Sequence, residues 1–167
     1  MQSPITVRPA VESDFDAVAR ITRDSYLAAG YFDDADHPYM RKVQDVAQRA
    51  GQATVWVAER AGDVVGSVTL ALAGEPYADI ALHDELEFRM LVVDPAVQRS
   101  GAGKAMMTAI LEHAKGLDGV RAVALTTGST WESARGLYNK TGFARVPERD
   151  WLVPGTDIKL LVYRLDL

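Results

Sequence analysis

The sequence contains no cysteine, and this absence excludes several kinds of chemistry. A disulfide framework, a zinc site made of thiolates and a cysteine nucleophile all depend on that residue. The lack of cysteine also agrees with a reducing compartment, in which disulfides rarely persist. Any reaction that the protein carries out must therefore use other side chains, the backbone or a bound molecule.

Long apolar runs and an excess of positive charge are missing as well. The first ten residues hold no apolar segment of signal-peptide length, and no later run approaches a membrane span. The net charge is −5 and the pI is near 5.2, whereas a general nucleic-acid binder usually presents a basic face. We expect a cytoplasmic protein that binds neither membranes nor nucleic acid, while a local basic pocket for a small anion stays open.

The residues that are present predict one mixed α/β domain over residues 1–167. A chain of 167 residues that is 48% hydrophobic is long enough for a single core. Expected strands are 5–9, 53–59, 64–72, 86–93, 120–127, 142–143 and 158–165, and expected helices are 15–28, 39–50, 101–115 and 132–140. This order gives a sheet of six to seven strands flanked by about four helices. An exposed final strand would allow a homodimer as well as a monomer.

Residues 98–104 read Gln-Arg-Ser-Gly-Ala-Gly-Lys and raise the question of a phosphate-binding loop. A Walker A loop would need Gly in place of Gln98 and Ser or Thr in place of Ala105. A Rossmann turn would need Gly or Ala in place of Met106. Both the P-loop and the dinucleotide interpretation therefore fail.

The physical features of an anion site remain at this loop. A helix is expected to begin within the glycines, and the first turn of a helix has backbone N–H groups without intrahelical partners. Gly101 and Gly103 would let an anion approach these groups, and Arg99 and Lys104 would neutralise it. A plain helix start with two solvated cations is the alternative.

Two segments together indicate a family. The spacing Gln98-x-x-Gly101-x-Gly103 resembles the Q/R-x-x-G-x-G/A acetyl-CoA loop of the GNAT N-acetyltransferases, and a strand ending in residues 91–95 (LVVDP) precedes it. Residues 134–143 (ARGLYNKTGF) are similar to that family's A-x-x-L-Y-x-x-x-G-F ending. A helix and a strand separate the two segments, as in the family. With the order of elements, the resemblance extends over essentially the whole chain.

One position departs from the family pattern. The family often has Asn three residues before the motif's Ala, where it contacts the cofactor, and this chain has Trp131 there. That contact would be lost, or remade by a neighbour such as Ser129 or Thr130.

The resemblance implies a mixed, mostly antiparallel GNAT sheet in which the strands at 86–93 and 120–127 splay into a V. Acetyl-CoA would bind there as co-substrate, without a metal. A backbone N–H near Leu91 would also polarise the thioester carbonyl. The residues that the resemblance assigns to acetyl-CoA are Leu91, Val93, Gln98, Arg99, Ser100, Gly101, Ala102, Gly103 and Lys104.

The same resemblance implies direct transfer of the acetyl group to an amine. Tyr138, in the L-Y pair, would protonate the departing thiolate, since a phenol and a thiol have similar pKa values. Packing at the edge of the core is the alternative for this ring. Glu87, eleven residues before Gln98, would take the proton of the amine, directly or through water. The alternative is a carboxylate that is solvated or paired with Arg89.

The acceptor pocket of this family is usually built by the loop between the first two helices. Tyr31, Phe32 and Asp33 lie in that loop and would suit a cationic amine with an apolar body. A solvated acidic loop is the alternative. Trp131 and Trp151 would line the mouth of the pocket or merely pack loops.

A small-molecule amine is the expected acceptor. A protein N-terminus or a lysine is the alternative acceptor, and a non-catalytic acyl-CoA-binding module is the alternative function. The three histidines show no spacing typical of metal ligands, so no metal is expected.

Overall fold

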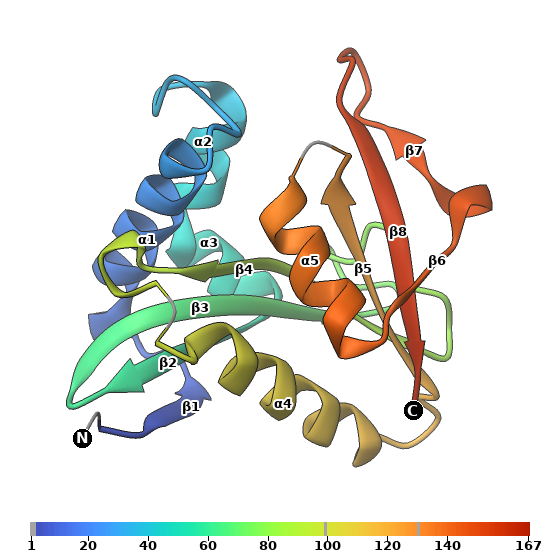
Figure 1. Ribbon diagram of the computed structural model, residues 1–167, viewed down its shortest axis with the longest axis horizontal. Coiled ribbons are helices and arrows are strands. Elements are labelled where there is room, and N and C mark those ends of the chain that lie inside the picture. The colour runs from blue at the N-terminus through green and yellow to red at the C-terminus, as the bar shows by residue number, and fades with distance from the viewer. Residues whose placement is uncertain (1–2, 99, 130) are drawn as a thin grey trace.

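The computed structural model describes residues 3–98, 100–129 and 131–167. Over these ranges eight strands form one sheet in the order β1-β2-β3-β4-β5-β8-β6, and β7 pairs with β8 (Figure 1). β4 and β5 are parallel and the other pairs are antiparallel, which confirms the predicted mixed α/β fold with eight strands in place of six to seven. The strands are β1 (Ile5–Pro9), β2 (Thr54–Arg60), β3 (Asp63–Leu72), β4 (Glu85–Val93), β5 (Ala122–Gly128), β6 (Ala144–Arg145), β7 (Trp151–Leu152) and β8 (Lys159–Asp166).

Helices cover both faces of the sheet. The core between α4, α5 and the sheet is separate from the cores that α1, α2 and α3 form against the opposite face. None of the helices formed by the described residues has the length and apolar character needed to cross a membrane. The helices are α1 (Phe15–Ala28), α2 (Pro38–Gln44), α3 (Val46–Gln52), α4 (Ala102–Lys115) and α5 (Glu132–Thr141).

The prediction of one helix over residues 39–50 is wrong, because Asp45 divides that segment into α2 and α3. Its backbone leaves the helical region, with φ −82° and ψ 74°, and its carboxylate accepts the N–H of Gln48 at 3.3 Å. A side chain that satisfies a free N–H at a helix start stabilises that start. Asp45 therefore ends one helix and caps the next, which gives five helices in the described ranges instead of four.

A β-bulge interrupts the pairing of β4 with β3. Ser67 pairs with Val92 and Thr69 pairs with Arg89, so β4 has one residue more than β3 between these pairs. Met90, within this stretch, has a φ of +54°, which is uncommon for any residue except Gly. A backbone in this conformation persists only where the surrounding structure holds it.

The bulge changes which side chains of β4 face which helices. Leu86 and Phe88, before the bulge, belong to the core under α4 and α5, and Leu91 and Val93 join that same core after it. Met90 instead packs in the core on the side of α1 and α2. Simple alternation would have put residues 91 and 93 on the face of Glu87. The extra residue therefore turns the second half of β4 over, at the position where the cofactor contacts were predicted.

β4 and β5 separate after a short stretch of pairing. The parallel ladder covers Glu85 to Phe88 on β4 and ends on β5 at Leu125. β5 continues against β8 as far as Gly128, and β4 continues against β3 as far as Val93. The two strands run apart beyond the ladder (Figure 1), which is the V that the resemblance implies.

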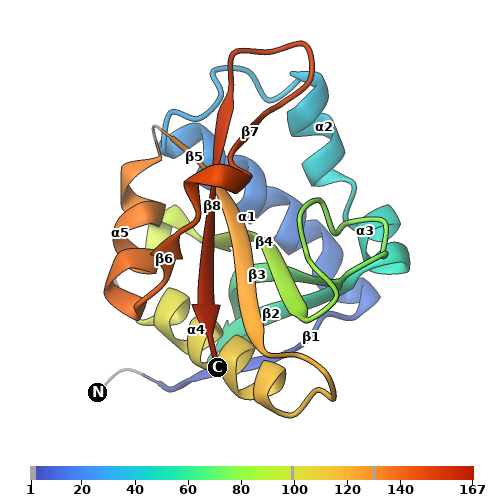
Figure 2. The ribbon, with the colours of Figure 1, turned by 90° about the vertical axis from the view of Figure 1, so that its right-hand side faces the viewer.

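The final strand is not a free edge. β8 lies between β5 and β6, and residues 159–160 also pair with β7. The expectation of an exposed last strand is therefore wrong, whereas the choice between a monomer and a homodimer stays a prediction. The connection between β7 and β8 and the loop before α2 instead rise at the same end of the molecule (Figure 1, Figure 2).

Candidate active site

The predicted anion loop ends in an exposed helix N-terminus. Gly101 caps α4 with a φ of +88°, a left-handed conformation that favours Gly, and its carbonyl accepts the N–H of Ala105 at 2.9 Å. The hydroxyl of Ser100 accepts the N–H of Ala102 at 3.4 Å. Arg99, which was predicted to contact the same anion, lies outside the described residues. The local chain therefore presents the first turn of α4 at the surface, as an anion site requires.

Gly103 leaves space that the protein itself does not fill. A Cβ atom at this position would lie 3.8 Å from Leu137 Cδ2 and 3.9 Å from Val93 Cγ2, which are ordinary van der Waals distances. Packing within the chain therefore does not require Gly here. Its bare backbone, with the exposed side chains of Gln98 and Lys104 nearby in sequence, fits close approach of an anionic group such as a pyrophosphate.

The edge of β4 runs from this helix toward the interior of the V. Residues 89–93 pair with β3 on one side, and the ladder to β5 has already ended on the other. Leu91 and Val93 are half-buried on this stretch. The open edge supplies backbone groups for a ligand, since unpaired N–H and C=O groups favour a hydrogen-bonding partner. The predicted cofactor positions Leu91 and Val93 thus lie on one continuous edge that leads to Gly103.

Tyr138, on α5, packs as a core side chain. Its ring is 6% exposed and lies 5.8 Å from Phe88 and 6.1 Å from Phe143, centre to centre, in edge-to-face arrangements. Burial raises the pKa of the phenol above its ordinary value, and the nearby Tyr31 adds to the shift. The phenol is therefore protonated at neutral pH, but its raised pKa also makes it a weaker acid than the ordinary phenol that matches a thiol.

Glu87 is fully buried beneath the connection between β3 and β4. Its carboxylate accepts backbone N–H groups of Ile80 at 2.9 Å, of Ala81 at 3.0 Å and of Asp79 at 3.2 Å. Burial raises the pKa of Glu87 above its ordinary value, although these three hydrogen bonds oppose the rise. The alternative of a solvated or Arg89-paired carboxylate is wrong. Glu87 instead fixes the segment that carries Asp79.

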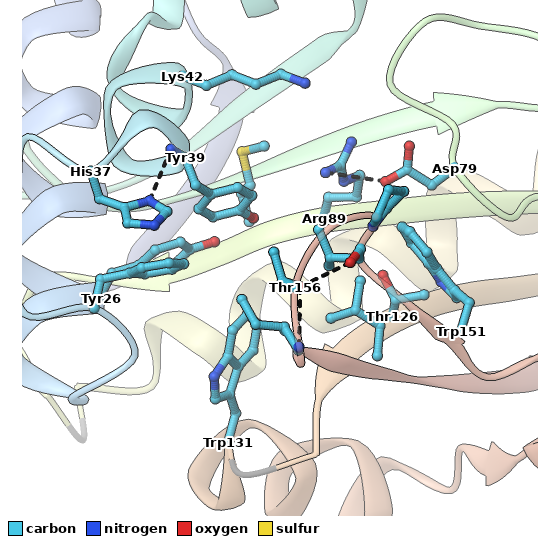
Figure 3. A pocket seen from close by; sticks show the side chains of 16 residues that line it. Tyr26, His37, Tyr39, Lys42, Asp79, Arg89, Thr126, Trp131, Trp151 and Thr156 are labelled. Carbon is cyan, nitrogen blue, oxygen red and sulfur yellow. Dashed lines mark hydrogen bonds and ion pairs between the residues drawn. The ribbon is translucent and has the colours of Figure 1, made fainter.

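A cavity of about 390 Å³ opens where β4 and β5 part (Figure 3). Arg89 and Met90 of β4 and Thr126 of β5 line it, and these residues directly follow the last paired positions. Its other lining residues come from α1, the loop before α2, α2, the connection between β3 and β4, the start of α5 and the β7–β8 hairpin: Tyr26, Phe32, His37, Tyr39, Lys42, Asp79, Trp131, Trp151, Val153, Pro154, Thr156, Ile158 and Leu160. The cavity therefore adjoins the inner end of the β4 edge.

Aromatic side chains form one wall of this cavity. Phe32 and Tyr39 stack with their ring centres 5.1 Å apart, and Tyr26 stacks on Tyr39 at 6.4 Å. Trp131 tilts against Tyr26 at 6.2 Å. Trp131 also lies against Gly128, where a Cβ atom would come within 2.5 Å of the indole. The Trp that departs from the family pattern thus has a defined place in the cavity wall.

The predicted acceptor residues have different positions. Phe32 lines the cavity, and Tyr31 stacks on Trp131 with ring centres 4.3 Å apart. Asp33 is exposed and is not among the lining residues. Trp131 and Trp151 both line the cavity, and that this cavity is the acceptor pocket stays a prediction.

Sequence reasoning missed Lys42 and Arg89 as cavity residues. Arg89 was considered only as a possible partner of Glu87, and Lys42 carries no motif that would single it out. Among the described residues, His, Asp and Glu side chains form no group of three that would hold a metal ion.

Known proteins resemble this chain in sequence and in fold. The model of the acetyltransferase (GNAT) family matches residues 15–143. The N-acetylaspartate synthetase of Danio rerio is 32% identical over 138 residues, which cover 82% of this chain and 46% of that protein. The mycothiol acetyltransferase of Cellulomonas flavigena is 33% identical over 120 residues, which cover 66% of this chain and 34% of that protein.

The fold has solved counterparts. An acetyltransferase from Salmonella typhimurium, solved with its cofactor acetyl-CoA, superposes with a TM-score of 0.67 at 21% identity over 98% of this chain and 94% of that chain. The chain spans less than half the length of the curated relatives that it matches. Since the family model covers most of the chain, the protein belongs to the GNAT acetyltransferase family.

Proposed function

We propose that the protein transfers an acetyl group from acetyl-CoA directly to an amine of a small molecule. One observation carries this proposal: a single open strand edge, residues 89–93 of β4, joins the N-terminus of α4 to the cavity. Arg89 and Met90 line the cavity, and Val93 lies beside the bare backbone of Gly103. Five strand residues span roughly 13 Å, so two ligands could approach the edge from its two ends.

The cofactor end would hold acetyl-CoA as co-substrate, which supplies an activated thioester. The N–H groups at the start of α4, with Lys104, would bind the pyrophosphate, and backbone groups of Leu91 and Val93 would bind the pantetheine arm. A backbone N–H near Leu91 would polarise the carbonyl. Removal of a hydrogen bond of this kind typically costs about 2.7–4 kcal/mol of transition-state stabilisation.

Two protons must move during the reaction. The amine nitrogen forms a bond to the carbonyl carbon, the carbon–sulfur bond breaks, and the sulfur takes a proton. Tyr138 is proposed to donate that proton, because its phenol is buried and protonated. Glu87 is proposed to accept the proton of the amine through water. Its raised pKa makes it a stronger base than an ordinary Glu, while its three backbone partners hold it away from direct contact.

Ligand-dependent thermal unfolding and thiol release together test the proposal. Acetyl-CoA and CoA, each at about a hundredfold of Kd, should stabilise the protein by ~2.7 kcal/mol, which is about 5–10 °C for a chain of this size. ATP and NADH at the same concentrations should give no shift. Thiol release from acetyl-CoA should then depend on an added small amine.

Three results would contradict the proposal in different ways. Binding of acetyl-CoA without release by any amine, peptide N-terminus or lysine would indicate a non-catalytic acyl-CoA-binding module. Thiol release with a peptide and not with small amines would indicate that the acceptor is a protein. An absence of any shift with CoA would remove the cofactor site itself.

A further inference from the structure

The charges that line the cavity are mainly positive. The lining residues include one Lys, one Arg and one carboxylate, namely Lys42, Arg89 and Asp79. Arg89 Nη2 lies 3.2 Å from Asp79 Oδ2, so the one carboxylate of the lining offsets only one of the two positive charges. Within the described ranges no carboxylate pairs with Lys42, and one positive charge is left over at the cavity.

Both cations lie against the same aromatic ring. Lys42 Nζ is 6.0 Å from the centre of the Tyr77 ring, and Arg89 Cζ is 5.8 Å from it. Arg89 is held further by a hydrogen bond that it donates to the carbonyl of Tyr77 at 3.2 Å. Lys42 and Arg89 both line the cavity, and the ring that they share places them on the same side of it.

A third cation lies behind this wall. Arg49 is fully buried and donates to Thr69 Oγ1 and to the carbonyl of Val43, both at 2.8 Å. Its Nε has no partner among the described residues, and neither of its two hydrogen bonds is to a carboxylate. Val43 follows Lys42 in α2, and Thr69 pairs with Arg89 across the sheet. Arg49 therefore adds a buried positive charge, without a carboxylate partner among the described residues, close to Arg89.

We infer that the acceptor amine carries a carboxylate and an aromatic or branched apolar body, as an amino acid does. Lys42 and Arg89 receive the carboxylate, and the wall of Tyr26, Phe32 and Tyr39 receives the body. The amine then faces the open edge of β4, where the acetyl group is expected. This inference rests on the proposed function. It replaces the expected cationic amine, because Asp33 lies outside the cavity lining.

Matched pairs of acceptors provide the test. L-Phenylalanine and phenethylamine share the amine and the ring and differ only in the carboxylate, and L-leucine and isopentylamine form a second pair. Thiol release from acetyl-CoA gives kcat/KM for each member. We expect the carboxylate member to be favoured by about 10–100-fold in at least one pair, the size typical of a hydrogen-bonded charge contact.

A pair of charge-reversal variants identifies the residue. Lys42→Glu should lower the preference by at least about tenfold. Arg41→Glu makes the same charge change at an exposed neighbour on α2 that is not among the lining residues, and it should leave the preference unchanged. Quenching of tryptophan fluorescence by each amine gives an independent binding readout, because Trp131 and Trp151 line the cavity.

The outcomes separate this inference from the proposed function. If the amines are acetylated but the two members of every pair react equally, or if Lys42→Glu behaves as Arg41→Glu does, the inference is overturned while the transferase stands. If no amine reacts although acetyl-CoA binds, the proposed function fails, and the inference fails with it.

Discussion

The two ends of the candidate site use different parts of the polypeptide, backbone groups at one end and side chains at the other. The cofactor end uses backbone: the start of α4, the bare Gly103 and the open edge of β4. The acceptor end uses side chains contributed by α1, α2, β4, β5, α5 and the β7–β8 hairpin. A backbone site is set by local conformation and tolerates varied side chains around it. A site formed by side chains changes with every substitution. One fold can therefore keep its cofactor site while its acceptor site varies from protein to protein.

The largest expected effect concerns the proposed proton donor. Tyr138→Phe removes only the hydroxyl from a ring that packs in the core, so the fold and both binding sites should be retained. The loss of a general acid should lower kcat by about 10²–10⁴-fold. Steady-state rates and CoA titration measure the two quantities separately. An unchanged kcat would remove Tyr138 from the mechanism, and a parallel loss of CoA affinity would make its role structural.

A second prediction concerns the scaffold of the acceptor end. Glu85 is fully buried, and Arg149 binds it with nitrogen–oxygen distances of 2.8 and 2.9 Å. Burial acts to raise the pKa of Glu85, but its hydrogen bonds with Arg149 and the N–H of Leu82 outweigh this effect and hold the pKa below its ordinary value. Arg149→Met should lower the free energy of unfolding by about 3 kcal/mol, because it leaves a buried charge short of a partner.

Denaturant unfolding measures this loss, and a double variant provides the control. Arg149→Met combined with Glu85→Leu removes both charges and should recover most of the stability. If the single variant is as stable as the wild type, the ion pair does not support this end of the molecule.

At the cofactor end we expect a substitution to weaken ligand binding without lowering stability. Gly103→Glu should leave the fold intact, since a Cβ atom there meets only ordinary contacts, but its charge should weaken CoA binding by about 10–100-fold. Gly51→Glu makes the same change at an exposed helical position with open space around it and should have no effect on CoA. Calorimetric titration measures both. Equal CoA affinities of the two variants would show that the glycine loop does not bind the cofactor.

The smallest expected effect is a pH dependence at Glu87. Its pKa is raised in the folded state, so its ionisation opposes folding as the pH rises from the ordinary Glu value through the raised one. Glu87→Gln cannot ionise, and it can still accept the hydrogen bonds of Ile80 and Ala81. The stability difference between variant and wild type should therefore shift in favour of the variant as the pH rises through this window. Thermal unfolding across pH measures it, and a difference independent of pH would contradict a raised pKa.

The contrast between the two ends also explains what the sequence could predict. The glycine loop could be predicted as an anion site because Gly101 and Gly103 are residues whose backbone properties are unusual. The bulge in β4 could not be predicted, because its positive φ falls on Met90, a residue type with no preference for that conformation. The break at Asp45 was missed because a capping carboxylate inside an apolar period resembles an ordinary surface position.

The acceptor end was predicted only in part. Phe32 was predicted from its loop between the first two helices, and Trp131 and Trp151 from their places beside the second motif, whereas Lys42 was not predicted. Lys42 contacts the cavity only because α2, β4 and the β7–β8 hairpin come together in three dimensions. The charge of the cavity, which decides what amine fits, is a property of that assembly and cannot be derived from any one segment.

Initial rates over a grid of acetyl-CoA and amine concentrations show whether both ligands occupy the β4 edge at the same time, as direct transfer is proposed to require. Double-reciprocal lines that intersect would show that both must be bound before any product leaves, as direct transfer requires. Parallel lines would indicate a covalent acetyl-enzyme and release of CoA before the amine binds, which would contradict the account.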